Sequence, residues 1–270
     1  MNRMFSLVVA GLVVAAVSVF AAPGDVIVRD NFTGTGTAPT TGKIPADLNN
    51  RPPDTTNLPG GNWVAGTGWS NGIYNNYAWA NADVQVRKSI ASAGSYTKPQ
   101  RITISADVNL GWTSATVRGP GVSGTTNAAY ARGVALGFFD VDRFTGAVVN
   151  ASGTLKFLNH SYWHAPDFIT TLAWAGEEPF DPSAWYNLTY TIDTSTGGIM
   201  DLEFDGVAYN VSTTAFTNAY TNLAGFYVNS DTGNTYGYVD NFQVMEMIPE
   251  PSTLACVAAA GLLALRRRRA

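Results

Sequence analysis

The chain has 270 residues, of which 20 are acidic, 16 are basic and one is a cysteine. Five of the basic residues lie among the first three and last five residues, so 11 remain against all 20 acidic residues between positions 25 and 250. This excess of negative charge makes nucleic acid a poor candidate partner, because binding it requires neutralisation of phosphates. The one thiol, Cys256, lies in an apolar stretch near the end, which excludes a disulfide framework elsewhere.

The first 21 residues have the order of a removable export signal. Arg3 supplies a short positive start, an apolar run covers residues 5–20, and small residues follow at Ala21 and Ala22. We expect signal peptidase to cut after Ala21 and the chain to leave the cytoplasm. A retained N-terminal anchor is the alternative, and we disfavour it because the run is short for a membrane span and ends in small residues.

Residues 22–248 are expected to form one all-β domain. They show short alternating runs separated by Gly, Asn, Asp and Pro, and no long helical periodicity. In the clearest run, 101–108, apolar residues such as Ile102 and Ile104 alternate with polar ones, so the apolar side chains would share one face of a strand. The predicted strands are 101–108, 133–139, 154–158, 187–192, 199–204, 223–228 and 236–244.

Turn signals and loops divide these strands. Asp205-Gly206 predicts a tight hairpin turn, and residues 196–198 predict a second one. Two stretches rich in Gly and Thr, 34–61 and 118–127, read as long loops, which are usually binding elements or mobile segments. Many short strands without a repeat of fixed period predict a two-sheet antiparallel sandwich of the jelly-roll type.

One segment of the middle resembles a known group of sandwiches. Trp185 leads into a run that ends at Asp193, and a hairpin that ends in Asp205-Gly206 follows. In this order the segment resembles concanavalin A-like, laminin-G-like jelly-roll domains. The resemblance implies their fold and no single activity, because that fold hosts lectins, other glycan-binding modules, glycosidases and adhesive domains.

The sequence Asp-Asn-Phe occurs near each end of the predicted domain, at residues 30–32 and 240–242. The first and last strands of jelly rolls commonly pair, so we expect the two triplets to lie close together. We favour paired strands whose Phe side chains enter the core and whose Asp and Asn residues fill a bulge. The alternative is a structural calcium site, whose oxygen ligands would be Asp30, Asn31, Asp240 and Asn241.

Aromatic residues in Gly- and Asn-rich segments are the candidates for glycan binding. Trp63 and Trp69 lie in such a segment, and Tyr74 and Tyr77 follow it. Exposed rings stack on the CH faces of sugars, while neighbouring Asn and Asp side chains bind hydroxyl groups. Extracellular polysaccharide is therefore the expected ligand class. We expect Trp185, at the start of a strand, to belong to the core instead.

The carboxylates of Asp201, Glu203 and Asp205 are the candidates for catalysis. On a strand they share one face, and retaining glycosidases need two carboxyl groups about 5–5.5 Å apart. Asp205, however, belongs to the predicted hairpin turn. We favour the solvent face of a strand whose Leu202 and Phe204 enter the core, and hence a non-enzymatic domain. A glycoside hydrolase or lyase that uses Asp201 and Glu203 is the alternative.

The two histidines, His160 and His164, are four residues apart, so a strand or a helix would present both on one side. Zinc usually needs a third protein ligand, and Asp167 is the acidic residue near them in sequence. Both histidines lie in an aromatic segment that would equally suit a groove. We favour such a segment without a metal.

Residues 249–270 combine three features in a fixed order. These are Pro249-Glu250-Pro251, an apolar run at 254–265, and Arg266, Arg267, Arg268 and Arg269. The arginines would keep the end of an apolar helix on the cytoplasmic side, although the run is shorter than the ~20 residues of a relaxed span. This order resembles the PEP-CTERM sorting signal of Gram-negative bacteria that make exopolysaccharide.

The PEP-CTERM resemblance implies transient anchoring in the inner membrane and processing by an exosortase, which recognises Pro-Glu-Pro and removes the tail. The protein would then reach the cell surface or the extracellular matrix. The expected organisation is a signal peptide (1–21), a jelly-roll ectodomain (22–248) and a sorting signal (249–270). We expect a non-catalytic module that contacts polysaccharide or serves a structural role, with structural calcium as its one candidate cofactor.

Overall fold

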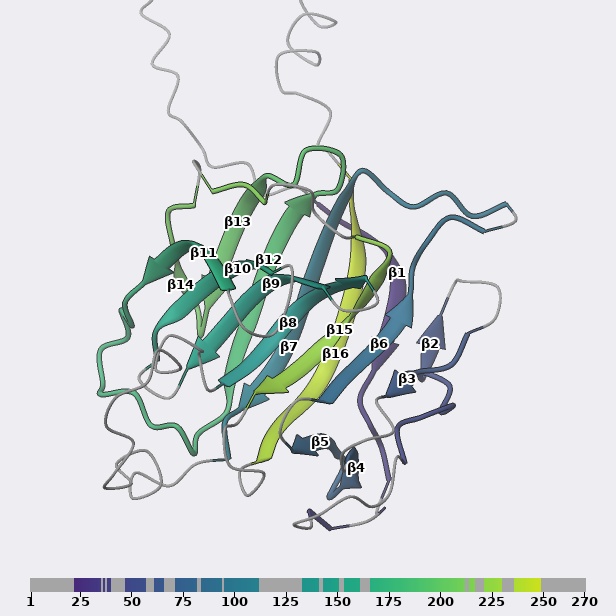
Figure 1. Cartoon of the computed structure of the whole chain (residues 1–270), viewed down its shortest axis with the longest axis horizontal. Helices are drawn as coiled ribbons and strands as arrows, with labels where there is room; N and C mark the ends of the chain where they lie inside the picture. Colours follow the sequence, from purple (N-terminus) through teal and green to yellow (C-terminus); the bar gives the residue numbers. More distant parts are fainter. Residues whose placement is uncertain are drawn as a thin grey trace, which may run out of the picture. The chain divides into compact units, whose positions relative to one another are not determined.

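Figure 1 shows the computed structural model of the chain, which describes residues 22–34, 36, 38–39, 47–56, 61–65, 71–81, 84–93, 95–111, 133–140, 143–150, 153–160, 166–211, 214–216, 221–229 and 236–248. Pro23–Met247 form one compact unit. The predicted signal peptide, sorting signal and loop 118–127 lie outside the described residues. Every extended regular element among the described residues is a β-strand. In that part of the chain, no helix has the length and apolarity needed to cross a membrane.

The first of two sheets contains nine strands among the described residues. They are β1 (Ala22–Asp30), β2 (Thr55–Thr56), β4 (Asn71–Tyr74), β5 (Tyr77–Asn81), β7 (Arg101–Asn109), β12 (Tyr186–Asp193), β13 (Ile199–Phe204), β14 (Val207–Ala208) and β16 (Tyr236–Ile248). Seven of them follow the order β14-β13-β12-β7-β16-β1-β2, while β5 pairs with β16 and β4 pairs with β5. The first and last strands, β1 and β16, are therefore neighbours, as predicted.

The second sheet contains seven strands among the described residues. They are β3 (Val64–Ala65), β6 (Val84–Ser89), β8 (Gly133–Asp140), β9 (Arg143–Asn150), β10 (Leu155–His160), β11 (Pro166–Leu172) and β15 (Leu223–Asn229). Their order is β11-β10-β9-β8-β15-β6-β3. Every pairing with a defined register, in either sheet, is antiparallel.

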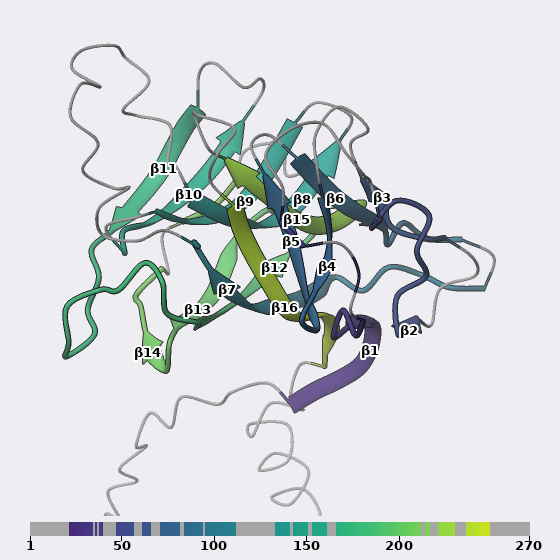
Figure 2. The same ribbon diagram turned by 90° about the horizontal axis from the view of Figure 1, so that it is seen from below.

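The two sheets face each other across the main core. Ile104 of β7, Leu136 of β8 and Phe157 of β10 belong to one cluster of buried side chains. Tyr190 of β12 links the sheets, because its hydroxyl donates to the carbonyl of Leu136 at 3.1 Å and its ring lies 5.8 Å from that of Phe157. Figure 2 shows the strands of the second sheet above those of the first. The predicted all-β architecture of two antiparallel sheets is confirmed.

The chain crosses between the sheets several times. Among the described strands it does so between β2 and β3, β3 and β4, β5 and β6, β6 and β7, β7 and β8, β11 and β12, β14 and β15, and β15 and β16. Strands that are distant in sequence therefore become neighbours, as β7 does with β12 on one side and β16 on the other. This arrangement brings side chains from β5, β7, β12 and β16 to one surface of the first sheet.

Two tight hairpin turns have backbone conformations that suit their sequences. Asp205 and Gly206 have φ values of 52° and 76° between β13 and β14, which confirms the predicted turn. Asn75 and Asn76 have φ values of 51° and 63° between β4 and β5. Positive φ at both central residues characterises type I′ turns, in which Asn, Asp and Gly are preferred.

Candidate functional site

The structure separates the four predicted glycan-binding residues. Trp63 is fully buried, so the prediction that its ring is available to a sugar is wrong. Trp69 lies outside the described residues. Tyr74 and Tyr77 are half-buried on either side of the β4–β5 turn. Trp185, predicted to lie in the core, is 41% exposed, so that prediction is wrong as well.

Trp63 is buried because it packs between the two Asp-Asn-Phe triplets. Its indole Nε1 donates to Oδ2 of Asp30 at 2.6 Å. Its ring centroid lies 5.8 Å from that of Phe32 and 5.3 Å from that of Phe242. Both Phe side chains are fully buried, which confirms that they enter the core. The ring of Trp63 thus contacts protein on several sides.

Trp185 is exposed because of the alternation along β12. Tyr186 and Leu188 are buried, whereas Asn187 is exposed and Thr189 is half-buried on the opposite face. Trp185 directly precedes this strand and has the parity of Asn187, so its side chain emerges on the outer face of the first sheet.

Four rings gather on this outer face, and we call Tyr74, Tyr77, Trp185 and Tyr238 the aromatic patch. The ring centroid of Tyr77 lies 6.2 Å from Tyr74, 5.6 Å from Trp185 and 5.1 Å from Tyr238. The rings of Trp185 and Tyr238 are 6.5 Å apart. Edge-on and tilted contacts of this kind hold aromatic rings in fixed relative orientations.

The aromatic patch is assembled from three places in the first sheet. The β4–β5 turn places Tyr74 opposite Tyr77 in the register. Tyr238 of β16 pairs with Trp79 of β5, two residues from Tyr77, so both tyrosines lie on the same face. Burial and the neighbouring Tyr74 raise the pKa of Tyr77, so its hydroxyl remains a protonated donor at neutral pH.

A polar cluster of Asp107, Asn187 and Asn241 lies on the same face. The side-chain amide of Asn187 donates to Oδ1 of Asp107 at 2.8 Å, and that of Asn241 donates to Oδ2 at 2.7 Å. The Oδ1 atom of Asn187 in turn accepts from the hydroxyl of Thr189 at 2.9 Å. The carboxylate of Asp107 is thereby held in one orientation from both sides.

The aromatic patch and the polar cluster are adjacent. Trp185 and Asn187 are two positions apart on one strand, and Tyr238 lies two positions before Asp240 on another. Asn187, Asp107 and Asp240 follow one another across β12, β7 and β16. Two residues along a strand cover about 7 Å, so one sugar ring and its hydroxyl groups can span both features.

Negative charge accumulates beside the polar cluster. Burial, followed by the charges of Asp107, Asp30 and Asp54, raises the pKa of Asp240. Burial also raises the pKa of Asp30, against the opposing effect of hydrogen bonds from Trp63 and Arg51. The β16–β7 register shifts between Asp240 and Gln243, which agrees with the predicted bulge at the second Asp-Asn-Phe triplet.

The calcium ligands predicted at Asp30, Asn31, Asp240 and Asn241 have other partners in this structure. Asp30 accepts hydrogen bonds from Trp63, Arg51 and the backbone N–H of Phe32. The backbone N–H of Asn31 donates to Asp54 at 2.9 Å, and the side chain of Asn241 binds Asp107. Within the described residues no group of three or more His, Cys, Asp or Glu could hold a metal ion. Calcium stays a prediction.

The candidate catalytic carboxylates lie on β13. Asp201 and Glu203 are exposed while Leu202 and Phe204 are buried, so the predicted alternation is confirmed. Asp205 lies in the hairpin turn. The cross-strand neighbours of Asp201 and Glu203 are residues 191 and 189 of β12, both threonines. The two carboxylates therefore share the outer face of the first sheet, one strand beyond the polar cluster.

The candidate zinc ligands cannot be placed together from the described side chains. His160 ends β10, where its Cα pairs with Pro166. Asp167 lies in β11 opposite Asn159, and His164 lies outside the described residues. A zinc site stays a prediction that we disfavour.

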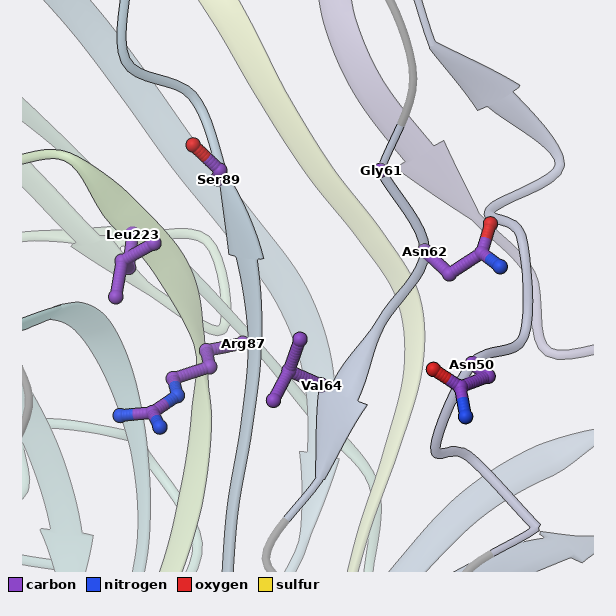
Figure 3. Close-up of a pocket in the computed structure, with 7 residues that line it drawn as sticks. All are labelled: Asn50, Gly61, Asn62, Val64, Arg87, Ser89 and Leu223. Carbon is purple, nitrogen blue, oxygen red and sulfur yellow. The ribbon is translucent and has the colours of Figure 1, made fainter.

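A pocket of about 560 Å³ opens on the second sheet (Figure 3). It is lined by Asn50, Gly61, Asn62, Val64, Arg87, Ser89 and Leu223. Arg87 pairs with Val64, and Ser89 pairs with Leu223, across β3, β6 and β15. The sequence predicted a long loop at 34–61, which supplies Asn50 and Gly61, but it did not predict the pocket itself.

No protein-family model and no curated protein matches the sequence. Among solved structures, the binding domain of botulinum neurotoxin DC in complex with SialylT superposes with a TM-score of 0.42 at 10% identity, over 70% of this chain and 43% of that one. The botulinum neurotoxin serotype G binding domain superposes with a TM-score of 0.41 at 9% identity, over 73% of this chain and 47% of that one. A mutant of Trypanosoma rangeli sialidase superposes with a TM-score of 0.40 at 13% identity, over 70% of this chain and 27% of that one. This chain thus spans less than half of each, a likeness too distant to transfer a ligand.

Proposed function

We propose that this chain is an exported cell-surface or matrix protein whose sandwich binds polysaccharide without cleaving it. The observation that carries the proposal is the aromatic patch beside the polar cluster on one outer face. Trp185, the most exposed member of the patch, is 41% exposed. Accessible aromatic rings next to fixed amides and a carboxylate are the combination that sugar recognition requires.

Each part of the site has a role in the proposed binding. The aromatic patch stacks on the apolar CH face of a pyranose ring. Asp107 accepts hydrogen bonds from sugar hydroxyls with its remaining lone pairs, and each Asn amide retains a second N–H that can donate to a sugar oxygen. Because Asn187 and Asn241 already orient Asp107, binding costs little ordering of these side chains.

The jelly-roll fold of concanavalin A-like type belongs to the same proposal. Its support is the repeated crossing between sheets and the neighbouring first and last strands, β1 and β16. This fold exposes a broad sheet surface on which a ligand can bind. It accommodates binding modules as well as enzymes, so the site alone decides the activity.

Export and sorting complete the proposal, on the basis of the two end segments. Signal peptidase removes residues 1–21, and the apolar run at 254–265 with the four arginines holds the chain in the inner membrane until an exosortase cuts at Pro249-Glu250-Pro251. The host is then a Gram-negative bacterium, and the destination is the cell surface or extracellular matrix. Polysaccharide is abundant at that destination, which agrees with the proposed ligand class.

A co-sedimentation assay tests the binding function. Residues 22–248, which contain the compact unit, are mixed with insoluble and cross-linked polysaccharides, with and without calcium, and the supernatants are tested for reducing ends. Retention on a glycan without sugar release is the expected result. Sugar release that Glu203→Gln abolishes would replace the proposal with a glycoside hydrolase or lyase. Absence of retention on every polysaccharide would leave a structural surface protein.

A further inference from the structure

We infer that the aromatic patch and the carboxylates beside it bind a polysaccharide that carries free amino groups, such as a partly de-N-acetylated polymer of hexosamine. That the ligand is a sugar rests on the proposed function, whereas its positive charge follows from the side chains around the patch. Aromatic rings alone accept the CH face of any pyranose. The neighbouring ionisable groups therefore decide which sugars are preferred.

Two carboxylates lie directly opposite each other beside the aromatic patch, and we call Asp107 of β7 and Asp240 of β16 the carboxylate pair. Both side chains are half-buried. Like charges at directly opposed positions destabilise a sheet. Natural proteins tolerate such local conflicts chiefly at functional sites, so this pair on the outer face points to a ligand of opposite charge.

No cationic side chain among the described residues forms an ion pair with the carboxylate pair. The nearby guanidinium of Arg51 binds Asp30 and Asp54 instead. Burial and the charges of Asp107, Asp30 and Asp54 raise the pKa of Asp240. The site therefore has a negative potential, which a protonated amino group of a ligand would reduce.

The carboxylate pair lies within reach of a sugar that stacks on the aromatic patch. Tyr238 and Asp240 are two positions apart on β16, which corresponds to about 7 Å along one face of a strand. A pyranose ring with an amino substituent spans a similar length. The amides of Asn187 and Asn241 already hold the carboxylate of Asp107 in one orientation, so a charge-assisted hydrogen bond from an ammonium group forms with little reordering.

The aromatic patch favours the same charge as the carboxylate pair. The face of an aromatic ring has a negative potential that attracts cations, and the attraction is strongest for Trp. Trp185 is 41% exposed, so its indole is available to an amino group as well as to a CH face. The rings and the carboxylates together therefore prefer an amino sugar over a neutral or an acidic one.

Calorimetric titration of the full chain tests the inference with matched ligands. The probes are oligomers of glucosamine and of galactosamine in their common linkages, each beside its N-acetylated form, which keeps the sugar skeleton and removes the charge. A chelator keeps calcium away from the carboxylates, and a pH of about 6 ionises ordinary carboxyl groups. We expect at least one amino oligomer to bind about tenfold more tightly than its N-acetylated form.

Substitutions on the outer face show whether the carboxylate pair causes this preference. Asp240→Asn removes one carboxylate with little change of shape and should reduce the preference to about twofold or less. Asp201→Asn removes an equal charge from β13, two strands away from β7 on the same sheet, and should preserve the preference. Trp185→Ala should weaken the binding of each amino oligomer and of its N-acetylated form.

The outcomes separate this inference from the proposed function. Equal affinity for every amino oligomer and its N-acetylated form, or an equal loss of preference in Asp240→Asn and Asp201→Asn, would overturn the inference. Retention on a neutral polysaccharide that Trp185→Ala weakens would then still support the proposed function. Absence of binding to every oligomer and every polysaccharide would reject both.

Discussion

The indole of Trp185 lies 5.6 Å from the ring of Tyr77, although β7 and β16 lie between the strands that carry them. Tyr238 of β16 contacts both rings, at 5.1 Å from Tyr77 and 6.5 Å from Trp185. Three segments that are remote in sequence therefore build one aromatic surface. Its position beside Asp107, Asn187 and Asn241 is the basis of the proposed glycan binding.

The polar cluster should contribute measurably to glycan affinity. Asn187→Ala removes the amide that orients Asp107 from one side and a donor for a sugar oxygen. Losing one such hydrogen bond costs about 1 kcal/mol, so affinity should fall about fivefold. Calorimetry on the polysaccharide that the protein retains measures the change. Asp201→Asn, on the same sheet face but outside the cluster, is the control, and equal losses in both variants would exclude a specific role for Asn187.

The pattern of residues predicted the fold better than the site. The runs at 101–108 and 199–204 alternate cleanly, and they appear as β7 and β13 with nearly the same bounds. The strands β2, β3, β4, β5, β6, β9 and β11 were not predicted, because short or mixed runs lack a clear alternation. The short strand β2 lies inside the stretch 34–61, so the prediction that this whole stretch is a loop is wrong there. Alternation of apolar and polar residues identifies a strand that has one buried face, whereas a strand covered on both faces lacks this alternation.

The candidate site could be predicted only in part. Tyr74 and Tyr77 were selected because they follow the Gly- and Asn-rich segment that contains Trp63 and Trp69, but the locations of Trp63 and Trp185 were reversed. Neighbouring Gly and Asn suggested that Trp63 is exposed, yet its burial depends on Asp30 and Phe242, which are far away in sequence. For Trp185 a signal existed, because alternation along the following strand gives it the parity of Asn187. Asp107 and Tyr238 join the site only through strand pairing.

The hydrogen bond of the Trp63 indole should stabilise the fold in addition to the packing of its ring. Trp63→Phe removes the indole N–H that donates to the buried Asp30 carboxylate at 2.6 Å. Loss of a hydrogen bond to a charged buried group and of packing volume should lower the free energy of unfolding by about 2–4 kcal/mol. Urea unfolding measures this value.

Trp174→Phe provides a matched comparison for Trp63. The indole of Trp174 donates to the neutral backbone carbonyl of Glu178 at 2.7 Å, in a half-buried position. Its loss should cost about 1 kcal/mol. Equal effects of the two substitutions would contradict a special role for the Trp63–Asp30 contact.

The raised pKa of Asp240 predicts a pH-dependent effect on stability. In the folded protein burial and the charges of Asp107, Asp30 and Asp54 disfavour its ionised form, so its folded pKa lies above the ordinary value of 3.8. The resulting destabilisation is absent below pH 3.8, develops as pH rises towards the folded pKa, and is complete above it. Asp240→Asn should therefore raise the free energy of unfolding at pH 7 and not at pH 3, as measured by urea unfolding. A gain of equal size at both pH values would contradict this cause.

The same variant tests the predicted calcium site. A cation bound by Asp30, Asn31, Asp240 and Asn241 would offset the repulsion and stabilise the folded state in proportion to its occupancy. Millimolar calcium should then raise the thermal midpoint of the unmodified domain and leave that of Asp240→Asn unchanged. Thermal midpoints that change with neither calcium nor a chelator would exclude the predicted calcium site.

The most direct test of the central claim is the affinity of Trp185→Ala for the polysaccharide that the unmodified domain retains. Trp185 is 41% exposed and Met200 on β13 is 39% exposed, so Met200→Ala is a control of equal accessibility outside the aromatic patch. We predict that Trp185→Ala weakens binding by about tenfold or more, with unchanged unfolding, whereas Met200→Ala binds normally. Normal binding by Trp185→Ala would contradict the claim that the aromatic patch is the glycan-binding surface.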